Sequence, residues 1–139
     1  MGLILVDSSV WIDLLGPKPT VQTEQLLRIL SDEQPLAVGD LIVTEVLQGT
    51  RSERAFRQGL AFLTEFDRVP IVDDRVALEA ARNYRYLRTR GVTIRSTIDT
   101  LIATRCILDD IPLLYSDRDF DPFVEHLGLI SAMSLPGAP

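Results

Sequence analysis

The sequence predicts an α/β fold, a three-layer sandwich in which helices flank a short, mostly parallel sheet of four or five strands. Short apolar runs alternate with segments of helical period along the chain. These runs lack the alternating polar positions of half-exposed strands, which is typical of strands covered on both faces. The length of 139 residues is usual for one domain. We therefore expect a single domain over residues 1–134 and a loose tail over residues 135–139.

Capping and stop residues divide the first half of the chain into alternating elements. The apolar run Leu3–Val6 predicts a buried strand, and Ser8 or Ser9 can cap a helix that ends at Leu15 before Gly16. The next expected elements are a helix over Val21–Ser31, a strand over Pro35–Val38, a helix capped by Asp40 that ends at Gln48, and a helix opened by Thr50 or Ser52.

The second half continues the alternation. Here the expected elements are a strand over Val69–Val72, a long helix capped by Asp73 or Asp74 that ends at Gly91, a helix from Ser96 to about Asp109, a strand over Pro112–Tyr115, a short helix over Asp119–His126 and a last strand over Leu129–Ile130. This order of strands and helices favours parallel strand pairing.

Several classes of protein are excluded by composition. Cys106 is the only cysteine, which rules out an intrachain disulfide and a cysteine-based zinc site. No apolar stretch approaches the ~20 residues of a membrane span. The apolar run near Met1 is short and lacks a basic segment before it, so it does not resemble a signal peptide. We expect a cytoplasmic protein with no membrane partner.

Two acidic residues follow predicted strands directly. Asp7 comes after the first strand, and Asp117 comes two residues after Tyr115. In open α/β sheets, ligands bind beyond the carboxyl ends of the strands. If the two strands are neighbours, both carboxylates reach one crevice. The alternative is that each aspartate only caps the helix that follows it.

Two further acids lie on predicted helices. Asp99 is the third residue after Ser96, the acidic position of a capping box, but its helix is strongly apolar and therefore central. Glu45 shares one side of its helix with Thr44 and Gln48, which is either a solvent-facing stripe or a side that faces the crevice. Both alternatives stay open from position alone.

Convergence of these acids would require a cation. Two carboxylates ~4 Å apart repel by roughly 4 kcal/mol at an effective dielectric of 20. Ligand sets made of carboxylate oxygen suit Mg²⁺ or Mn²⁺, and such a site activates water and stabilises charge on a phosphodiester. The candidate catalytic residues are Asp7, Glu45, Asp99, Asp117 and the nearby Asp119, of which the first four are candidate metal ligands.

Rival chemistries lack their residues. His126 is the only histidine, so cleavage by paired histidines is excluded, and a Ser-His-Asp triad would also need a G-x-S-x-G motif that the chain does not contain. There is no phosphate-binding P-loop and no G-x-G-x-x-G. A phosphoacceptor receiver domain remains an alternative, although Lys18, the only lysine, does not follow a predicted strand.

The net charge of −6 argues at first against a nucleic-acid partner. Without the five candidate acids, however, the chain has 14 basic and 15 acidic residues. No acid occurs between Ala80 and Ile98, where the arginines are Arg82, Arg85, Arg88, Arg90 and Arg95. Because the last three lie nearest the connection into Asp99, we predict that they contact phosphate groups. The alternative is that these arginines only form a solvated face of a helix.

Four short motifs together resemble the PIN domain, and most closely the VapC-like toxins of bacterial toxin–antitoxin pairs. They are Asp7-Ser8-Ser9-Val10-Trp11, Glu45-Val46-Leu47-Gln48-Gly49, Ser96-Thr97-Ile98-Asp99-Thr100-Leu101-Ile102-Ala103 and Ser116-Asp117-Arg118-Asp119-Phe120. No single motif is specific, but their order, their spacing and the total length all fit, and the match covers nearly the whole chain.

The resemblance implies an Mg²⁺-dependent endoribonuclease that cuts structured RNA such as tRNA or rRNA, forms a homodimer and is neutralised by a cognate antitoxin. It implies that Asp7 and Asp99 are the chief metal ligands and that Glu45 and Asp117 complete the cluster, whereas the family has an acid at the position of Asp119 often but not always. By the same resemblance, the groups that orient ligands or contact phosphate are Ser8, Ser96 and Thr97.

Two more expectations concern binding. The predicted helices Val21–Ser31 and Leu41–Gln48 carry many large aliphatic residues, so we expect apolar interfaces there for the dimer and the antitoxin. A PIN fold that binds RNA or protein without cleaving anything is the main alternative to the enzyme.

Overall fold

The computed structural model describes residues 2–138, and a four-stranded sheet with the order β3-β2-β1-β4 lies at its centre. All three strand pairings are parallel. The strands are β1 (Ile4–Val6), β2 (Leu36–Gly39), β3 (Asp67–Val69) and β4 (Leu113–Leu114). The predicted fifth strand at Leu129–Ile130 is wrong: this segment contributes a single bridge between Ser131 and Leu113.

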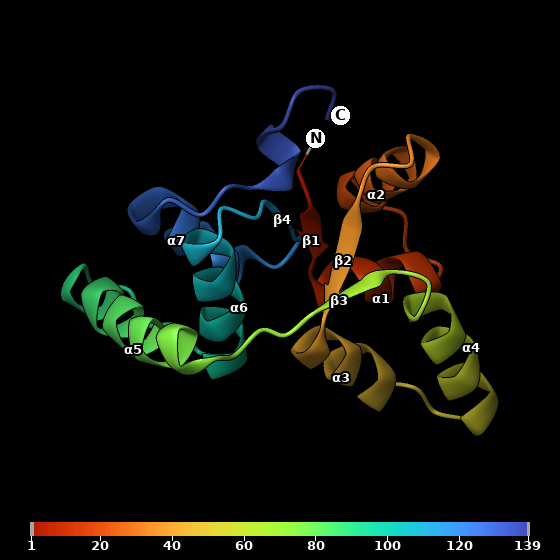
Figure 1. Ribbon diagram of the computed structural model, residues 1–139, viewed down its shortest axis with the longest axis horizontal. Coiled ribbons are helices and arrows are strands. Elements are labelled where there is room, and N and C mark those ends of the chain that lie inside the picture. Colours follow the sequence, from red (N-terminus) through yellow and green to blue (C-terminus); the bar gives the residue numbers. More distant parts are fainter. Residues whose placement is uncertain (1, 139) are drawn as a thin grey trace.

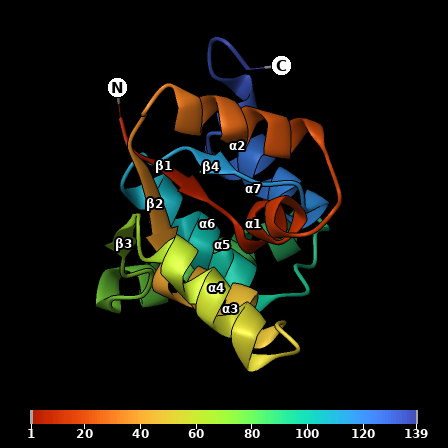
Figure 2. The same ribbon diagram turned by 90° about the vertical axis from the view of Figure 1, so that its right-hand side faces the viewer.

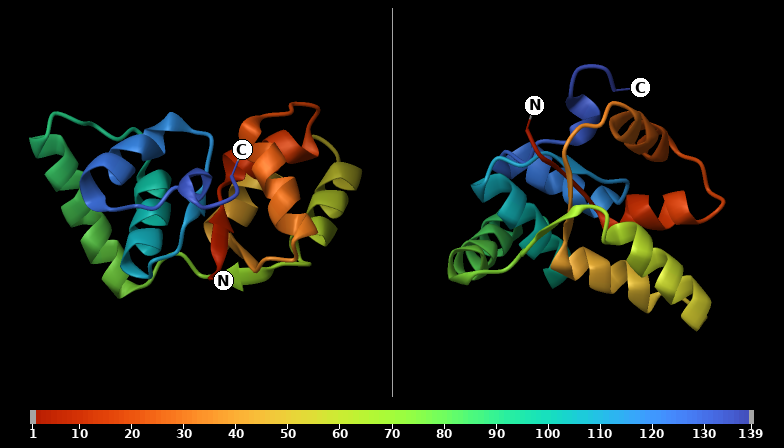
Figure 3. Two further views of the ribbon diagram at one scale, coloured as in Figure 1. Left: turned by 90° about the horizontal axis from the view of Figure 1, so that it is seen from above. Right: turned by 45° about the vertical axis from the view of Figure 1, so that its right-hand side comes forward.

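Helices cover both faces of this sheet and complete the predicted three-layer sandwich. The helices α1 (Ser8–Leu15), α2 (Val21–Ser31), α3 (Asp40–Gln48) and α4 (Glu53–Leu63) lie on one side, as Figures 1 and 2 show. On the other side lie α5 (Asp74–Thr89), α6 (Thr97–Leu108) and α7 (Asp121–Leu127), which Figure 3 shows with the sheet between the two groups. Two short 3-10 turns, η1 (Arg118–Phe120) and η2 (Ala132–Ser134), occur near the end of the chain.

Trp11 joins the first strand to the helical layer. Its side chain is fully buried, and its indole Nε1 donates a hydrogen bond of 3.1 Å to the carbonyl of Val6. The indole ring packs against Phe62 and Phe66, with ring centroids 5.6 and 5.2 Å away. A buried indole needs a partner for its N–H, and this one also fixes α1 against the end of β1.

Most element boundaries match the sequence prediction, and the differences have local causes. Asp7 caps α1 in place of Ser8 or Ser9, whereas Ser52, Asp73 and Ser96 cap their helices as expected. At α3 the cap is Gly39, and Asp40 is the first helical residue.

The edge strand β3 begins two residues earlier than predicted. It contains Asp67 and Arg68, both exposed, so its hydrophobicity does not mark it as a strand. The apolar segment that follows is instead fixed to α3, because the backbone N–H of Ile71 donates to Oδ1 of Asp40 at 3.0 Å. Gly39 allows this approach, since a Cβ there would lie 2.7 Å from Cδ1 of Ile71.

Near its end the chain still contacts the core. Leu135 is half-buried and packs against the core residues. Residue 139 of the expected tail lies outside the described residues, so the loose tail stays a prediction. Within residues 2–138, no helix combines the length and the apolar character needed to cross a membrane.

Candidate active site

Asp7 lies at the carboxyl end of β1, and its two carboxylate oxygens have different roles. Its backbone N–H donates to the carbonyl of Leu114 in the neighbouring strand β4 at 2.9 Å. Oδ2 accepts hydrogen bonds from the backbone N–H of Ser9 at 3.1 Å and from its hydroxyl at 2.6 Å. Oδ1 has no hydrogen-bond partner among residues 2–138, although the residue is only 2% exposed. Asp7 therefore caps α1 with one oxygen and leaves the other for a ligand.

Ser9 links the two strand ends and was not singled out from the sequence. Its hydroxyl donates to Asp7 and accepts a hydrogen bond of 3.3 Å from the backbone N–H of Ser116. One side chain thus holds the loop after β4 against the loop after β1. From the sequence, Ser9 was indicated only as a possible helix cap two residues after Asp7.

Glu45 comes to the site from α3. The hydroxyl of Ser8 donates a hydrogen bond of 3.1 Å to its Oε1. The pKa of Glu45 is raised by partial burial, and the nearby Asp7 and Asp117 add to the rise. Glu45 itself thus faces the crevice, whereas Thr44 and Gln48, which share its side of the helix, are exposed to solvent.

Asp99 lies in the first turn of α6. Ser96 caps this helix, and its hydroxyl accepts a hydrogen bond from the backbone N–H of Asp99 at 3.2 Å. In the part of the chain that the structure describes, the Asp99 carboxylate accepts no hydrogen bond from the backbone N–H of Ser96. The capping box is therefore only half formed. The residue Asp99 is instead only 8% exposed, and its carboxylate lies near those of Asp117 and Asp119. Burial first, then the charges of the neighbouring acids, raise its pKa to about 7.

Asp117 and Asp119 arrive from the loop after β4. Oδ1 of Asp117 accepts a hydrogen bond of 2.9 Å from the backbone N–H of Asp119, which closes the turn η1. Carboxylate oxygens of Asp99, Asp117 and Asp119 lie within 4.8 Å of one another. Nη2 of Arg95 lies 3.5 Å from Oδ1 of Asp119.

Three of the five predicted acids, Asp99, Asp117 and Asp119, gather beyond the strand ends, and Asp7 and Glu45 lie near enough for their charges to raise the pKa of Asp99. Burial raises the pKa of Asp7, and the nearby Asp117 adds to the rise. The raised pKa values and the partnerless oxygen of Asp7 mark a site that is electrostatically incomplete. Carboxylate oxygens alone are hard ligands, which fit Mg²⁺ or Mn²⁺. The residues present thus fit a divalent cation.

The predicted RNA-contacting residues differ in their exposure and in their contacts with other residues. Ser8 and Ser96 hold Glu45 and the start of α6, and Thr97 is exposed at the first helical position. Of the arginines, Arg88 lies over the ring of Tyr84 at 5.8 Å, Arg90 is exposed, and Arg95 contacts the acidic cluster. These assignments remain predictions.

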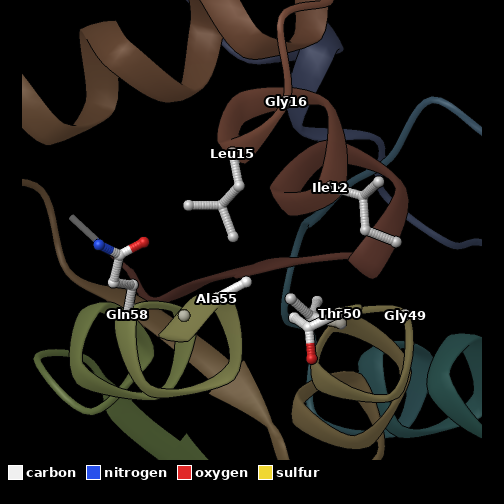
Figure 4. A pocket seen from close by; sticks show the side chains of 9 residues that line it. Ile12, Leu15, Gly16, Gly49, Thr50, Ala55 and Gln58 are labelled. Carbon is white, nitrogen blue, oxygen red and sulfur yellow. The ribbon is translucent and has the colours of Figure 1, made fainter. Parts of the chain in front are cut away.

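A separate apolar hollow lies between α1, α3 and α4. Its volume is about 340 Å³, and Figure 4 shows Ile12 and Leu15 on one wall with Ala55 and Gln58 opposite them. Ile12 and Leu15 are each 49% exposed. None of the five acids lines this hollow, so it is not part of the acidic site.

Comparison with known proteins agrees with the geometry. The family model of the PIN domain matches residues 4–124. The chain is 30% identical over 138 residues to the VapC ribonuclease Mb1587 of Mycobacterium bovis and to the ribonuclease VapC11 of Mycobacterium tuberculosis, with 94% of this chain and 98% of each relative covered.

Solved structures share the fold at lower identity. VapBC2 from Rickettsia felis, bound to a DNA fragment from its promoter, superposes with a TM-score of 0.74 at 16% identity and covers 94% of this chain and 97% of that chain. FitAcB from Neisseria gonorrhoeae gives 0.70 at 20% identity, with 92% and 96% covered. VapC20 of Mycobacterium tuberculosis, a sarcin-ricin loop cleaving toxin, gives 0.61 at 15% identity, with 85% and 92% covered. The chain belongs to the PIN-domain family, and VapC ribonucleases are among its relatives.

Proposed function

We propose that this protein is a metal-dependent endoribonuclease and the toxin of a toxin–antitoxin pair. The observation that carries the proposal is the buried, partnerless Oδ1 of Asp7 near the cluster of Asp99, Asp117 and Asp119. A buried carboxylate oxygen without a hydrogen-bond donor is costly, and a cation removes that cost. Two relatives that match nearly the full length are named as ribonucleases, which supports RNA as the substrate.

The roles of the individual residues follow from their contacts. Asp7 and Asp99, the most buried of the five acids, would be the chief ligands of Mg²⁺ or Mn²⁺, with Glu45 and Asp117 completing the set. A bound ion of this kind supplies an activated water and neutralises charge on the phosphodiester. Asp119 is half-buried and lies close to Asp99 and to the exposed Asp117, where it can orient water or a ligand.

Two hydroxyl groups keep these carboxylates in place. Ser9 holds Oδ2 of Asp7, which turns Oδ1 toward the cluster. Ser8 holds Oε1 of Glu45. Groups that orient metal ligands affect metal affinity and activity almost as strongly as the ligands do.

We further propose a homodimer in the cytoplasm and control by a cognate antitoxin. Several of the structural neighbours are complexes of VapB with VapC or of FitA with FitB-type partners, which supports a protein inhibitor. Exposed aliphatic side chains occur on α2, at Val21 and Leu27, and on α1 beside the hollow of Figure 4, although the most exposed one is Leu78 on α5. On α3, in contrast, Leu41 and Val43 are half-buried. Apolar contact for protein partners is therefore expected on α1 and α2.

The direct test is cleavage of total cellular RNA by the purified protein with and without Mg²⁺, followed by mapping of new 5′ ends. We expect a few discrete new ends that need Mg²⁺ and are absent with Asp7→Asn. RNA binding without metal-dependent cleavage would instead assign the protein to the non-catalytic binding modules.

A further inference from the structure

Arg95 is the basic residue that contacts the acidic cluster. Among residues 2–138, none of Asp7, Glu45, Asp99 and Asp117 forms an ion pair, and Asp119 pairs only with Arg95 at 3.5 Å. The other arginines in the acid-free span are placed differently, since Arg82 pairs with Glu79 on its own helix at 3.4 Å. The contact therefore belongs to the site itself.

The backbone around Arg95 is anchored, but its side chain is not. Ile94 is buried in the core, and Ser96 caps α6. The Arg95 side chain is 84% exposed, and its ion pair with Asp119 is its only polar side-chain contact within the described part of the chain. The guanidinium can thus rotate away from Asp119 without any change in the fold.

We propose that Arg95 is an exchangeable counter-ion: it neutralises Asp119 in the metal-free site, and it turns to a phosphate of the RNA when a divalent cation occupies the carboxylates. This inference rests on the proposed function. A guanidinium binds phosphate oxygens in a bidentate geometry as readily as it binds a carboxylate. The same side chain therefore has two partners that are needed at different times.

The consequence is a coupling between metal and RNA. Arg95 opposes metal binding in the free protein, because its positive charge on Asp119 lies close to Asp99 and Asp117 and repels a cation bound there. When RNA is present, the guanidinium binds an RNA phosphate instead of Asp119, and it no longer opposes metal binding. Coupling of this kind is reciprocal, so metal must strengthen RNA binding by the same factor by which RNA strengthens metal binding.

The first measurement is calorimetric titration of RNA-free protein with Mn²⁺ at low salt. We expect Arg95→Gln to bind Mn²⁺ about two- to five-fold more tightly than the wild type, the range for an exposed ion pair. The matched control is Arg85→Gln, which removes the same charge from an exposed site that pairs with none of the five acids, and its Mn²⁺ affinity should equal that of the wild type. The melting temperatures should be equal, because Arg95 is exposed.

The second measurement is the affinity for a labelled 12-nucleotide uridine RNA by fluorescence anisotropy, with and without Ca²⁺ as a probe of the metal site. In the wild type and in Arg85→Gln, Ca²⁺ should strengthen RNA binding by the same factor. In Arg95→Gln that factor should be about two- to five-fold smaller.

The proposal is overturned if Arg95→Gln binds Mn²⁺ no more tightly than the wild type, or if Ca²⁺ strengthens RNA binding equally in both. Cleavage by the wild-type protein in Mg²⁺ is measured on the same preparations. Metal-dependent cleavage together with either negative result leaves the proposed function standing and removes only the role of Arg95. A wild type that neither binds Mn²⁺ nor cleaves RNA contradicts both.

Discussion

The hydroxyl of Ser8 donates a hydrogen bond of 3.1 Å to Oε1 of Glu45, which joins the first residue of α1 to the middle of α3. The two residues are 37 positions apart in the chain, and the contact spans the crevice beyond the strand ends. It leaves Oε2 of Glu45 for another partner. The position of one candidate ligand therefore depends on a neighbour of another, Asp7.

Replacement of Ser8 by Ala should lower RNA cleavage by about 10- to 100-fold, the usual effect of removing a group that orients a metal ligand. The reason is that Glu45 would lose its only side-chain hydrogen bond among the described residues. The melting temperature should change little, since the pair is only partly buried. Rates measured across a range of Mg²⁺ concentrations check this, and unchanged rates at low Mg²⁺ would show that Ser8 does not orient the ligand.

Asp7→Asn and Asp99→Asn should each abolish cleavage and leave the protein folded. The amide at position 7 can still accept the hydrogen bonds from Ser9, so α1 keeps its cap. If Asp99 were only a helix cap, its replacement would keep activity and lower stability by about 1 kcal/mol. Cleavage and melting temperature measured on the same samples separate the two. Wild-type cleavage by Asp99→Asn would end its assignment as a ligand.

The metal-free protein should become less stable as the pH rises from about 4 to about 7. The pKa of Asp99 is about 7 in the fold and has an ordinary value of 3.8, so the unfolded chain loses this proton first and unfolding becomes easier. One such group changes the free energy of unfolding by at most roughly 1.4 kcal/mol per pH unit. Asp7 and Glu45, whose pKa values are also raised, act in the same direction.

Urea unfolding between pH 4 and 8 in a chelating buffer measures this dependence. Asp99→Asn should flatten the curve, because the amide does not titrate. A wild-type curve that rises over this interval, or one that the substitution leaves unchanged, is incompatible with a buried, crowded Asp99.

Mg²⁺ should raise the melting temperature of the wild type in the millimolar range, following mass action in the free ion. The increase should be smaller in Asp7→Asn, where one negative charge and one ligand are gone. Ca²⁺-free and Mg²⁺-free scans in EDTA give the baseline. A melting temperature that does not respond to Mg²⁺ would contradict a preformed cluster.

RNA affinity should depend more on the connection before α6 than on the outer face of α5. Replacing Arg90 and Arg95 together by Ala should weaken binding and reduce its salt slope by roughly 0.7–0.9 for each lost phosphate contact. The same double change at Arg82 and Arg85 should have a smaller effect, because Arg82 already pairs with Glu79. Salt titrations of both double variants measure the slopes, and equal slopes would place the RNA path elsewhere.

The sequence was most informative where burial and position coincide. Asp7 and Asp117 could be placed at one edge because short apolar strands precede them, and the register of Val6 with Leu114 brings those strand ends together. β3 could not be located in the same way, because Asp67 and Arg68 lie on an exposed edge strand where backbone pairing, not hydrophobicity, defines the element. Leu129 is apolar because it packs in the core, and the single bridge beside it is made by Ser131, so the composition of Leu129–Ile130 predicted a strand that does not form.

The Asp99 case shows why local patterns could not decide the site. Ser96 and Asp99 match a capping box. Only the three-dimensional arrangement shows that the Asp99 carboxylate lies near acids that are distant in the sequence, from Asp7 to Asp119. The contact of Arg95 with Asp119 was likewise hidden, since it joins two loops that share no sequence pattern.

The central position of β1 in the sheet has a consequence for synthesis of the chain. Asp7 leaves the ribosome first, but the strand that pairs with β1 on its far side, β4, is made only at residues 113–114. Asp117 and Asp119 follow it, so a nascent chain that has reached α6 still lacks two of its five acids and the backbone N–H of Ser116 that binds Ser9. The cluster of Asp99, Asp117 and Asp119 is therefore complete only after the loop that follows β4 has been translated.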